Sequence, residues 1–235
     1  MIQVSLKKIQ ELNDVIGLGE YGLVSSIRYQ VALEYLSDIC KKDKSICEIG
    51  PGGVIAYVAR YSDADTSAIV NPLETHWDHH FKSYGINLYQ WDLNEPLNNR
   101  ELHGLFDCVI FLETLEHLNR WPEKVLADIH KLLKPQGTLL LSTPNLVRAS
   151  NRLRMLLGRP PNNPFKYTSG GEHHVREYTL GELKDFMPEK DWKIIEYSYE
   201  FPHSLRSLWF FKIILKFFKA IVGTIIFIKA KKNIQ

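Results

Sequence analysis

The sequence predicts an α/β fold built on a parallel, doubly wound sheet. Short apolar runs of strand length alternate with segments whose apolar residues recur at helical spacing. A glycine-rich turn directly follows the first of these runs, and polar residues follow the ends of the others. Ligands of such sheets bind outside the carboxyl ends of the strands. The residues that follow each predicted strand are therefore where chemistry is expected.

The first predicted elements surround the glycine-rich turn. Apolar residues at helical spacing predict a helix over residues 28–42. Residues 44–49 form a short buried strand in this prediction, and the Gly-Pro-Gly-Gly turn leads into a helix over 54–60. Two weaker strands are predicted at 67–70 and 86–89, each ending at polar residues.

The second half of the chain contains stronger patterns. A continuous apolar run predicts a strand over 106–112, and an amphipathic pattern that begins with a proline predicts a helix over 122–133. A turn at 135–137 precedes another apolar strand over 138–142. The remaining predictions are a short helix over 179–187 and alternating strands over 192–199 and 224–230.

Composition indicates a globular protein. The chain has 235 residues, of which 45% are apolar and 24% charged, and these values exclude a disordered or low-complexity protein. We expect a single domain over residues 1–235. Three cysteines, Cys40, Cys47 and Cys108, are too few for a disulfide framework or a four-thiolate zinc site. A reducing, cytoplasmic setting without a signal peptide is the simplest expectation.

Basic residues are concentrated at the C-terminal end. Residues 203–235 contain seven basic residues and no acidic one, which leaves the rest of the chain with a net charge of −5. Residues 206–222 predict a basic amphipathic helix before the last strand, with Lys212, Lys216 and Lys219 on one stripe. Such a helix suits the surface of a membrane, peripherally on its inner face. A dimer interface and a lid over an apolar substrate are the alternatives.

The glycine-rich turn alone is a weak signal for a ligand. Glycines between a strand and a helix let a ligand approach the backbone and present amide N–H groups. A nicotinamide site would need a third glycine where Ile55 stands, and an acid at the end of the second strand, where the chain has Asn71. The sequence therefore disfavours a dinucleotide site.

Several motifs taken together resemble a known family. They are E-I-G-P-G-G at 48–53, D-L at 92–93, F-D-C-V-I-F-L-E-T-L-E-H-L at 106–118, L-L-K-P-Q-G-T-L-L-L-S-T-P-N at 132–145 and G-E-H-H-V-R-E-Y-T-L-G-E-L at 171–183. The set resembles class I S-adenosylmethionine-dependent methyltransferases. The last motif resembles their small-molecule O-methyltransferase branch, which includes the ubiquinone-biosynthesis type. The resemblance implies a Rossmann-like methyltransferase fold, with a mostly parallel seven-stranded sheet and an antiparallel last strand.

The resemblance also implies which residues hold S-adenosylmethionine. Glu48 would orient the glycine turn near the amino end of the cofactor. Gly50 and Gly52 would let the backbone approach its methionine and ribose parts. The chain departs from the family pattern at Val54, where a further glycine is usual, and at Asn71, where an acid usually binds both ribose hydroxyls. Asn71 lacks the charge that makes such hydrogen bonds strong.

Further cofactor contacts are implied after the third and fourth strands. Asp92 would accept a hydrogen bond from the adenine amino group, and Leu93 would pack near the adenine ring. Leu112 and Glu113 would flank the methionine part. Glu74 would be a substitute partner for the ribose hydroxyls.

The spacing E-x-x-E-H at Glu113, Glu116 and His117 predicts the reaction site. On a helical turn these three side chains share one face, and His174 precedes a predicted helix as a fourth candidate. This set resembles that of metal-dependent small-RNA terminal methyltransferases and would suit Mg²⁺ or Mn²⁺. The alternative needs no metal: Glu116 then makes hydrogen bonds, and His117 or His174 acts as general base.

The sequence supports three functions to different degrees. The leading one is S-adenosylmethionine-dependent O-methylation of a small molecule such as a sugar, a lipid-linked compound or a quinone-like compound. Residues 146–178 would then form a substrate-side segment. A metal-dependent RNA methyltransferase is the second, and the acidic body disfavours nucleic acid. A non-catalytic cofactor-binding scaffold at a membrane is the third.

Overall fold

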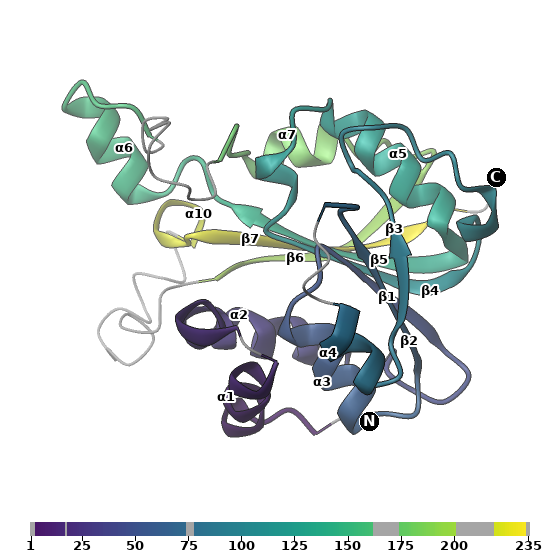
Figure 1. Ribbon diagram of the computed structural model, residues 1–235. Coiled ribbons are helices and arrows are strands. Elements are labelled where there is room, and N and C mark those ends of the chain that lie inside the picture. Colours follow the sequence, from purple (N-terminus) through teal and green to yellow (C-terminus); the bar gives the residue numbers. More distant parts are fainter. Residues whose placement is uncertain (1–2, 17, 74–77, 162–173, 201–218, 234–235) are drawn as a thin grey trace.

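The computed structural model of the chain describes residues 3–16, 18–73, 78–161, 174–200 and 219–233. A seven-stranded sheet with the strand order β3-β2-β1-β4-β5-β7-β6 lies at its centre. Helices α1 to α4 cover one face of the sheet and α5 and α7 cover the other, while α6 projects from the body (Figure 1). Strand β7 is antiparallel to both neighbours and the other pairs are parallel. The predicted fold class is confirmed.

The strands are β1 (Ser45–Ile49), β2 (Asp65–Val70), β3 (Asn87–Gln90), β4 (Phe106–Leu112), β5 (Leu133–Pro144), β6 (Trp192–Glu200) and β7 (Ile225–Lys232). The α-helices are α1 (Leu6–Val15), α2 (Gly19–Leu36), α3 (Gly53–Tyr61), α4 (Asp78–Ser83), α5 (Pro122–Leu132), α6 (Ala149–Leu156), α7 (Leu180–Asp185) and α10 (Lys219–Val222). Two short 3₁₀ helices are η1 (Arg100–Leu102) and η2 (Leu115–His117).

The N-terminal helices extend beyond the sequence prediction. Helix α1 was not predicted, because charged and polar residues separate its apolar ones. Its buried residues Ile9 and Leu12 nevertheless face the apolar cluster that α2 and α3 also line. Helix α2 begins at Gly19 rather than at residue 28. This extra length brings Asn13 of α1 against α2, where its side-chain amide donates to the Gly22 carbonyl at 2.8 Å.

The turn predicted at residues 135–137 is a bulge inside strand β5. Pairing with β4 jumps from Leu133, which lies opposite Phe106, to Thr138, which lies opposite Cys108. Gln136 adopts a left-handed backbone conformation, with φ 61°. The turn is present, but the strand begins before it.

Apolar clusters cover both faces of the sheet, and all three cysteines are buried free thiols. The prediction that Cys47 and Cys108 are core residues is confirmed, since both are completely buried. Burial raises the pKa of the Cys40 thiol to about 12 and that of the other two thiols as well. These thiols are therefore structural rather than nucleophilic.

Two predicted segments are described only in part. Within 146–178, residues 162–173 lie outside the described residues; the chain is described again from His174, where it runs beside the end of β4. There the backbone N–H groups of Val175 and Arg176 donate to the Glu116 carbonyl at 2.7 and 3.2 Å. Of the predicted amphipathic helix 206–222, only α10 is described. No helix in the described part is long and apolar enough to cross a membrane.

Candidate active site

The glycine turn after β1 is organised by a buried carboxylate. Glu48 is 2% exposed, and one of its oxygens accepts hydrogen bonds from the backbone N–H groups of Gly52 and Ile55 at 3.0 and 2.9 Å. Burial raises the pKa of Glu48 to about 7, although the two N–H donors oppose this shift. Gly50 has φ 65°, a conformation that side chains rarely adopt. The conformation of the turn therefore depends on Glu48, which precedes it, and on the glycine at position 50.

Helix α2 places two further residues against this turn. A Cβ atom on Gly52 would lie 2.6 Å from the hydroxyl of Tyr29, so only glycine fits beneath that ring. Beside it, a guanidinium nitrogen of Arg28 lies 3.5 Å from a carboxylate oxygen of Glu113. The sequence prediction missed Arg28 and Tyr29 as site residues. They stand at the start of the predicted helix 28–42, but nothing in the sequence indicates that this helix meets the turn.

Glu113 follows β4 in a left-handed conformation, with φ 47°. One of its carboxylate oxygens accepts a hydrogen bond from the Ser142 hydroxyl at 2.8 Å, and the other faces Arg28. Burial raises its pKa, and the Arg28 charge opposes this. The Glu113 carboxylate thus contacts side chains of both α2 and β5.

Three of the four predicted metal ligands come together next to it. Glu116, His117 and His174 each offer one donor atom, and the three atoms lie within 4.8 Å of one another. The two imidazole rings are 5.0 Å apart and meet edge to face. Glu113 is not in this cluster. Its left-handed backbone precedes η2, so the helical face assumed by the E-x-x-E-H spacing does not extend back to it.

Glu116 is completely buried within this cluster. One of its carboxyl oxygens accepts a hydrogen bond from the Thr143 hydroxyl at 3.1 Å, and the other has no hydrogen-bond partner among the described residues. Burial and the neighbouring Glu113 raise its pKa to about 9. An orphaned oxygen of this kind is costly in the absence of a partner, and it marks the place where a proton, an ion or a substrate would bind.

His174 is held from behind by Glu177. Its Nδ1 atom lies 3.1 Å from a Glu177 oxygen, and the two guanidinium nitrogens of Arg148 reach the same carboxylate at 2.6 and 3.0 Å. The Asn151 amide donates to it at 2.8 Å. Burial alone would raise the pKa of Glu177, but these donors outweigh burial and lower it. Sequence reasoning gave Glu177 no role.

The strand ends divide into two halves. The central half comprises the residues after β1 and β4, described above. The outer half comprises the residues after β2 and β3. Among its described residues, Asn94 accepts a hydrogen bond from the distant Asn119 N–H at 2.9 Å, whereas the side chains of Asn71 and Asp92 make local contacts. Asn71 accepts from the Leu73 N–H and Asp92 accepts from the Asn94 N–H, both at 3.0 Å. Leu93 is buried.

Comparison with known proteins gives a family. Residues 27–197 match the family model described as a methyltransferase domain. The chain belongs to this methyltransferase family. No curated protein matches the methyltransferase significantly.

Solved structures agree with the fold. An S-adenosylmethionine-dependent methyltransferase from Mesorhizobium loti superposes with a TM-score of 0.60 at 14% identity, covering 86% of this chain and 96% of that one. A SAM-dependent methyltransferase from Archaeoglobus fulgidus gives 0.56 at 13% identity, covering 86% and 92%. The cyclase SpnF gives 0.56 at 14% identity, covering 88% and 83%. The methyltransferase fold thus also occurs in a protein named for a different reaction, so substrate must be argued from the site.

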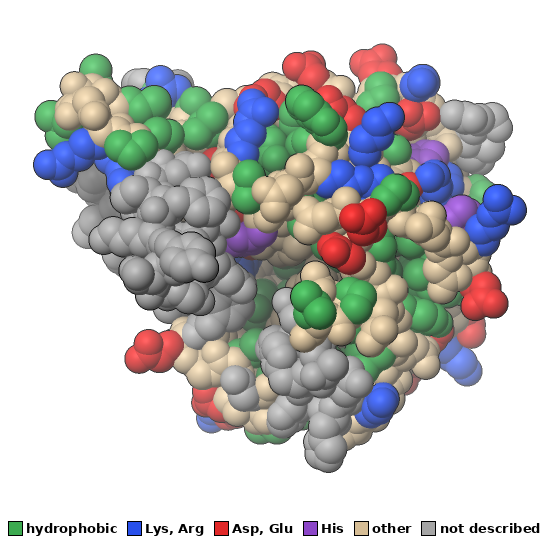
Figure 2. Space-filling model, turned by 45° about the horizontal axis from the view of Figure 1, so that its top comes forward, with side chains coloured by type: hydrophobic (Ala, Val, Ile, Leu, Met, Phe, Trp, Pro, Cys, Tyr) green, Lys and Arg blue, Asp and Glu red, His purple; other side chains and the backbone are tan. Residues whose placement is uncertain are grey.

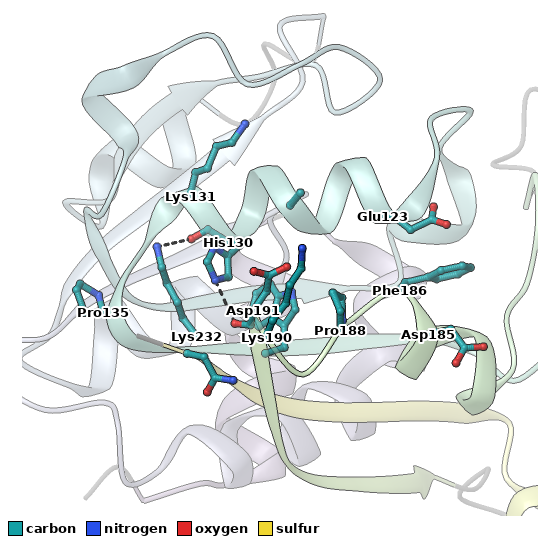
Figure 3. Close-up of a pocket in the computed structure, with 13 residues that line it drawn as sticks. Glu123, His130, Lys131, Pro135, Asp185, Phe186, Pro188, Lys190, Asp191 and Lys232 are labelled. Carbon is teal, nitrogen blue, oxygen red and sulfur yellow. Dashed lines mark hydrogen bonds between the residues drawn. The ribbon is translucent and has the colours of Figure 1, made fainter. Parts of the chain in front are cut away.

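The methyltransferase also has a cavity of about 630 Å³ between α5 and the segment after α7 (Figure 3). Two of its polar groups already have partners within the protein. The Lys232 ammonium donates to the carbonyls of His130 and Leu133 at 2.8 and 2.9 Å, and the Nε2 atom of His130 lies 3.1 Å from the Asp191 carbonyl. These residues surround the start of β5, whereas the glycine turn follows the carboxyl end of β1. We therefore locate the candidate active site at the carboxyl ends of the strands.

Proposed function

We propose that this methyltransferase uses S-adenosylmethionine to methylate an oxygen of a small acceptor. The observation that carries the proposal is the pairing of His117 with His174 just after β4, where Thr114 lies beside Gly50 of the turn that Glu48 organises. When bound, S-adenosylmethionine supplies a methyl group on a positively charged sulfur. Transfer then requires that an acceptor oxygen be held in line with that group and shielded from water.

The central half fits the amino-acid end of such a cofactor. The turn at Gly50 and Gly52 would lie against the cofactor, with Leu112 and Glu113 on the other side. The space that a Cβ would need at these two glycines is taken by Thr114 and Tyr29, so glycine lets the turn pack against both. Arg28, although paired with Glu113, brings a positive charge that suits a carboxylate. In the outer half, Asn71 would face the ribose, and Asp92 and Leu93 would face the adenine.

The histidines supply the acid–base chemistry. An acceptor hydroxyl must lose its proton as the methyl group is transferred, and imidazole accepts protons near neutral pH. We propose His117 or His174 as that base. Glu116, whose pKa is raised to about 9, is protonated at neutral pH and is thus able to donate a hydrogen bond to the acceptor.

A divalent cation is a second way in which this cluster would act. Glu116 offers an orphaned oxygen, and His117 and His174 offer nitrogens within 4.8 Å. Mixed nitrogen and oxygen ligands suit Mn²⁺ better than Mg²⁺. A bound cation would lower the pKa of the acceptor hydroxyl. Calorimetric titration with Mn²⁺ after EDTA treatment tests this, and binding that survives His117→Ala would contradict it.

The surface of α6 supports an apolar acceptor presented by a membrane. This helix projects from the body, and hydrophobic and basic side chains gather on it (Figures 1 and 2). Leu156 is 83% exposed, and residues 146–171 contain five basic residues and no acidic one. The other exposed large apolar residues here are Leu153, Met155 and Leu157. Together with the helix predicted at 206–222, this favours peripheral contact with an anionic inner membrane face and a lipid-linked or quinone-like acceptor over RNA.

Flotation with vesicles tests the membrane contact. We expect the protein to float with vesicles that contain phosphatidylglycerol and not with pure phosphatidylcholine. The Leu153→Ser/Leu156→Ser variant should float less, while Leu73→Ser, which removes an exposed leucine elsewhere, should float like the wild type. Equal flotation of all three proteins would exclude α6 as the contact.

Calorimetric titration with S-adenosylhomocysteine tests the cofactor. We expect a micromolar dissociation constant, which corresponds to about −8 kcal/mol, and an acceptor screen would follow. A folded sample that does not bind would contradict the proposal and favour a scaffold without catalysis.

A further inference from the structure

Glu177 occupies the centre of a buried network that joins α6 to the histidine pair. The carboxylate is 2% exposed and receives four donors: two from Arg148, one from Asn151 and one from His174. A carboxylate has about four lone-pair sites. Each oxygen therefore accepts two hydrogen bonds, and the hydrogen-bonding capacity of the group is filled.

This arrangement determines which nitrogen of His174 carries a proton. A carboxylate in a bidentate pair with arginine is an acceptor only. The Nδ1 atom that lies 3.1 Å from it must therefore be the donor. In neutral imidazole the proton is then on Nδ1, and Nε2 keeps its lone pair. Nε2 is the atom with which His174 can accept a proton or bind a cation.

Two different anchors hold this part of the chain. The backbone after His174 is fixed by the Glu116 carbonyl, which accepts from Val175 and Arg176. That contact fixes the backbone but leaves the rotation of the imidazole ring open. The contact with Glu177 restrains the ring itself. Glu177 is in turn held by Arg148 and Asn151, at the start of α6 and within it.

We propose that Glu177 is a positioning residue that fixes the tautomer and the ring orientation of His174. Its importance for methyl transfer rests on the proposed function, whereas its effect on the imidazole does not. Arg148 and Asn151 extend the network into α6, the helix with the exposed leucines. Helix α6 and the ring of His174 are therefore held by one carboxylate, that of Glu177.

The tautomer can be measured directly. Long-range ¹H–¹⁵N spectra of the cofactor-free protein at pH 8 distinguish a protonated Nδ1 from a protonated Nε2. We expect His174 in the wild type to be protonated on Nδ1. A wild-type spectrum with the proton on Nε2 would overturn the proposal without any variant.

Glu177→Gln is the matched substitution, because it keeps the shape and removes the charge and one acceptor. We expect the proton of His174 to redistribute toward Nε2 and kcat to fall roughly 10- to 100-fold, the range seen when hydrogen-bond partners of metal-bound histidines are removed. The affinity for S-adenosylhomocysteine should change less than about twofold. Glu182→Gln is the control, since Glu182 is a half-buried carboxylate in the same segment that pairs with Arg176 and forms the capping box of α7, which glutamine also forms. It should keep the wild-type spectrum and kcat.

The outcomes separate this proposal from the proposed function. An unchanged His174 spectrum in Glu177→Gln would overturn the positioning role, whatever the activity. If the wild type transfers no methyl group to any acceptor, the proposed function fails, yet the spectra still decide the role of Glu177. Should Glu177→Gln not fold, Glu177→Asp retains the charge and shortens the side chain, and the same shift toward Nε2 is expected. Retention of the wild-type spectrum in that variant would count against the proposal.

Discussion

The central and outer halves of the strand ends are held in different ways. In the central half, contacts join residues far apart in the sequence, such as Arg28 with Glu113 and Ser142 with Glu113. In the outer half, Asn71 and Asp92 bond to backbone groups only two residues away. The polar side chains of the central half are therefore tied into the folded core, while those of Asn71 and Asp92 stabilise local turns. Substitutions in the central half should change both the free energy of unfolding and the affinity for S-adenosylhomocysteine. Substitutions at Asn71 and Asp92 should change the affinity alone.

Glu48→Ala should have the largest effect. It removes the acceptor for two buried N–H groups, which lowers the free energy of unfolding by about 3 kcal/mol and abolishes binding of S-adenosylhomocysteine. Urea unfolding and calorimetry measure the two effects. Glu101→Ala, at an exposed acid, is the control and should change neither. If Asp92→Ala destabilises the protein as much as Glu48→Ala, the contrast between the halves is wrong.

The pH dependence of stability should reveal the buried carboxyl of Glu48. Its pKa is about 7 in the folded state and about 4.5 when unfolded, so the folded state holds a proton that the unfolded state releases between these values. This contribution to stability is fully present below pH 4.5 and is lost as the pH rises through 7. Relative to Glu48→Gln, the wild type should lose on the order of 3 kcal/mol between pH 4.5 and 8. Urea unfolding of both proteins across this range measures it, and parallel curves would contradict it.

Asn71→Asp should act in the outer half without affecting folding. A carboxylate there would form charge-assisted hydrogen bonds with ribose hydroxyls, which strengthens S-adenosylhomocysteine binding up to about tenfold. The free energy of unfolding should stay within about 0.5 kcal/mol of the wild type, as for other substitutions outside the core. Asn71→Leu removes the polar group as a control and should bind more weakly. Tighter binding by that variant would show that Asn71 does not face the ribose.

The same division explains what the sequence could predict. Continuous apolar runs predicted the buried strands, and Asn71 and Asp92 were found from their place at predicted strand ends and from the family resemblance. The spacing at Glu116 and His117, together with His174, anticipated the cluster. Arg28 and Glu177 were missed because their roles depend on packing between distant segments. Glu113 lies away from the face shared by Glu116 and His117 because its own φ angle is positive, at 47°.

The buried thiols make the stability of the sheet directly observable. Cys47 lies in β1 and Cys108 opposite its neighbour in β4, while Cys40 follows α2. With pKa values raised by burial, none of them can react with an aromatic disulfide reagent until water reaches it. The rate of modification at each cysteine therefore reports how often that part of the molecule opens. Cysteine modification therefore measures the local opening of β1 and β4 without any added label.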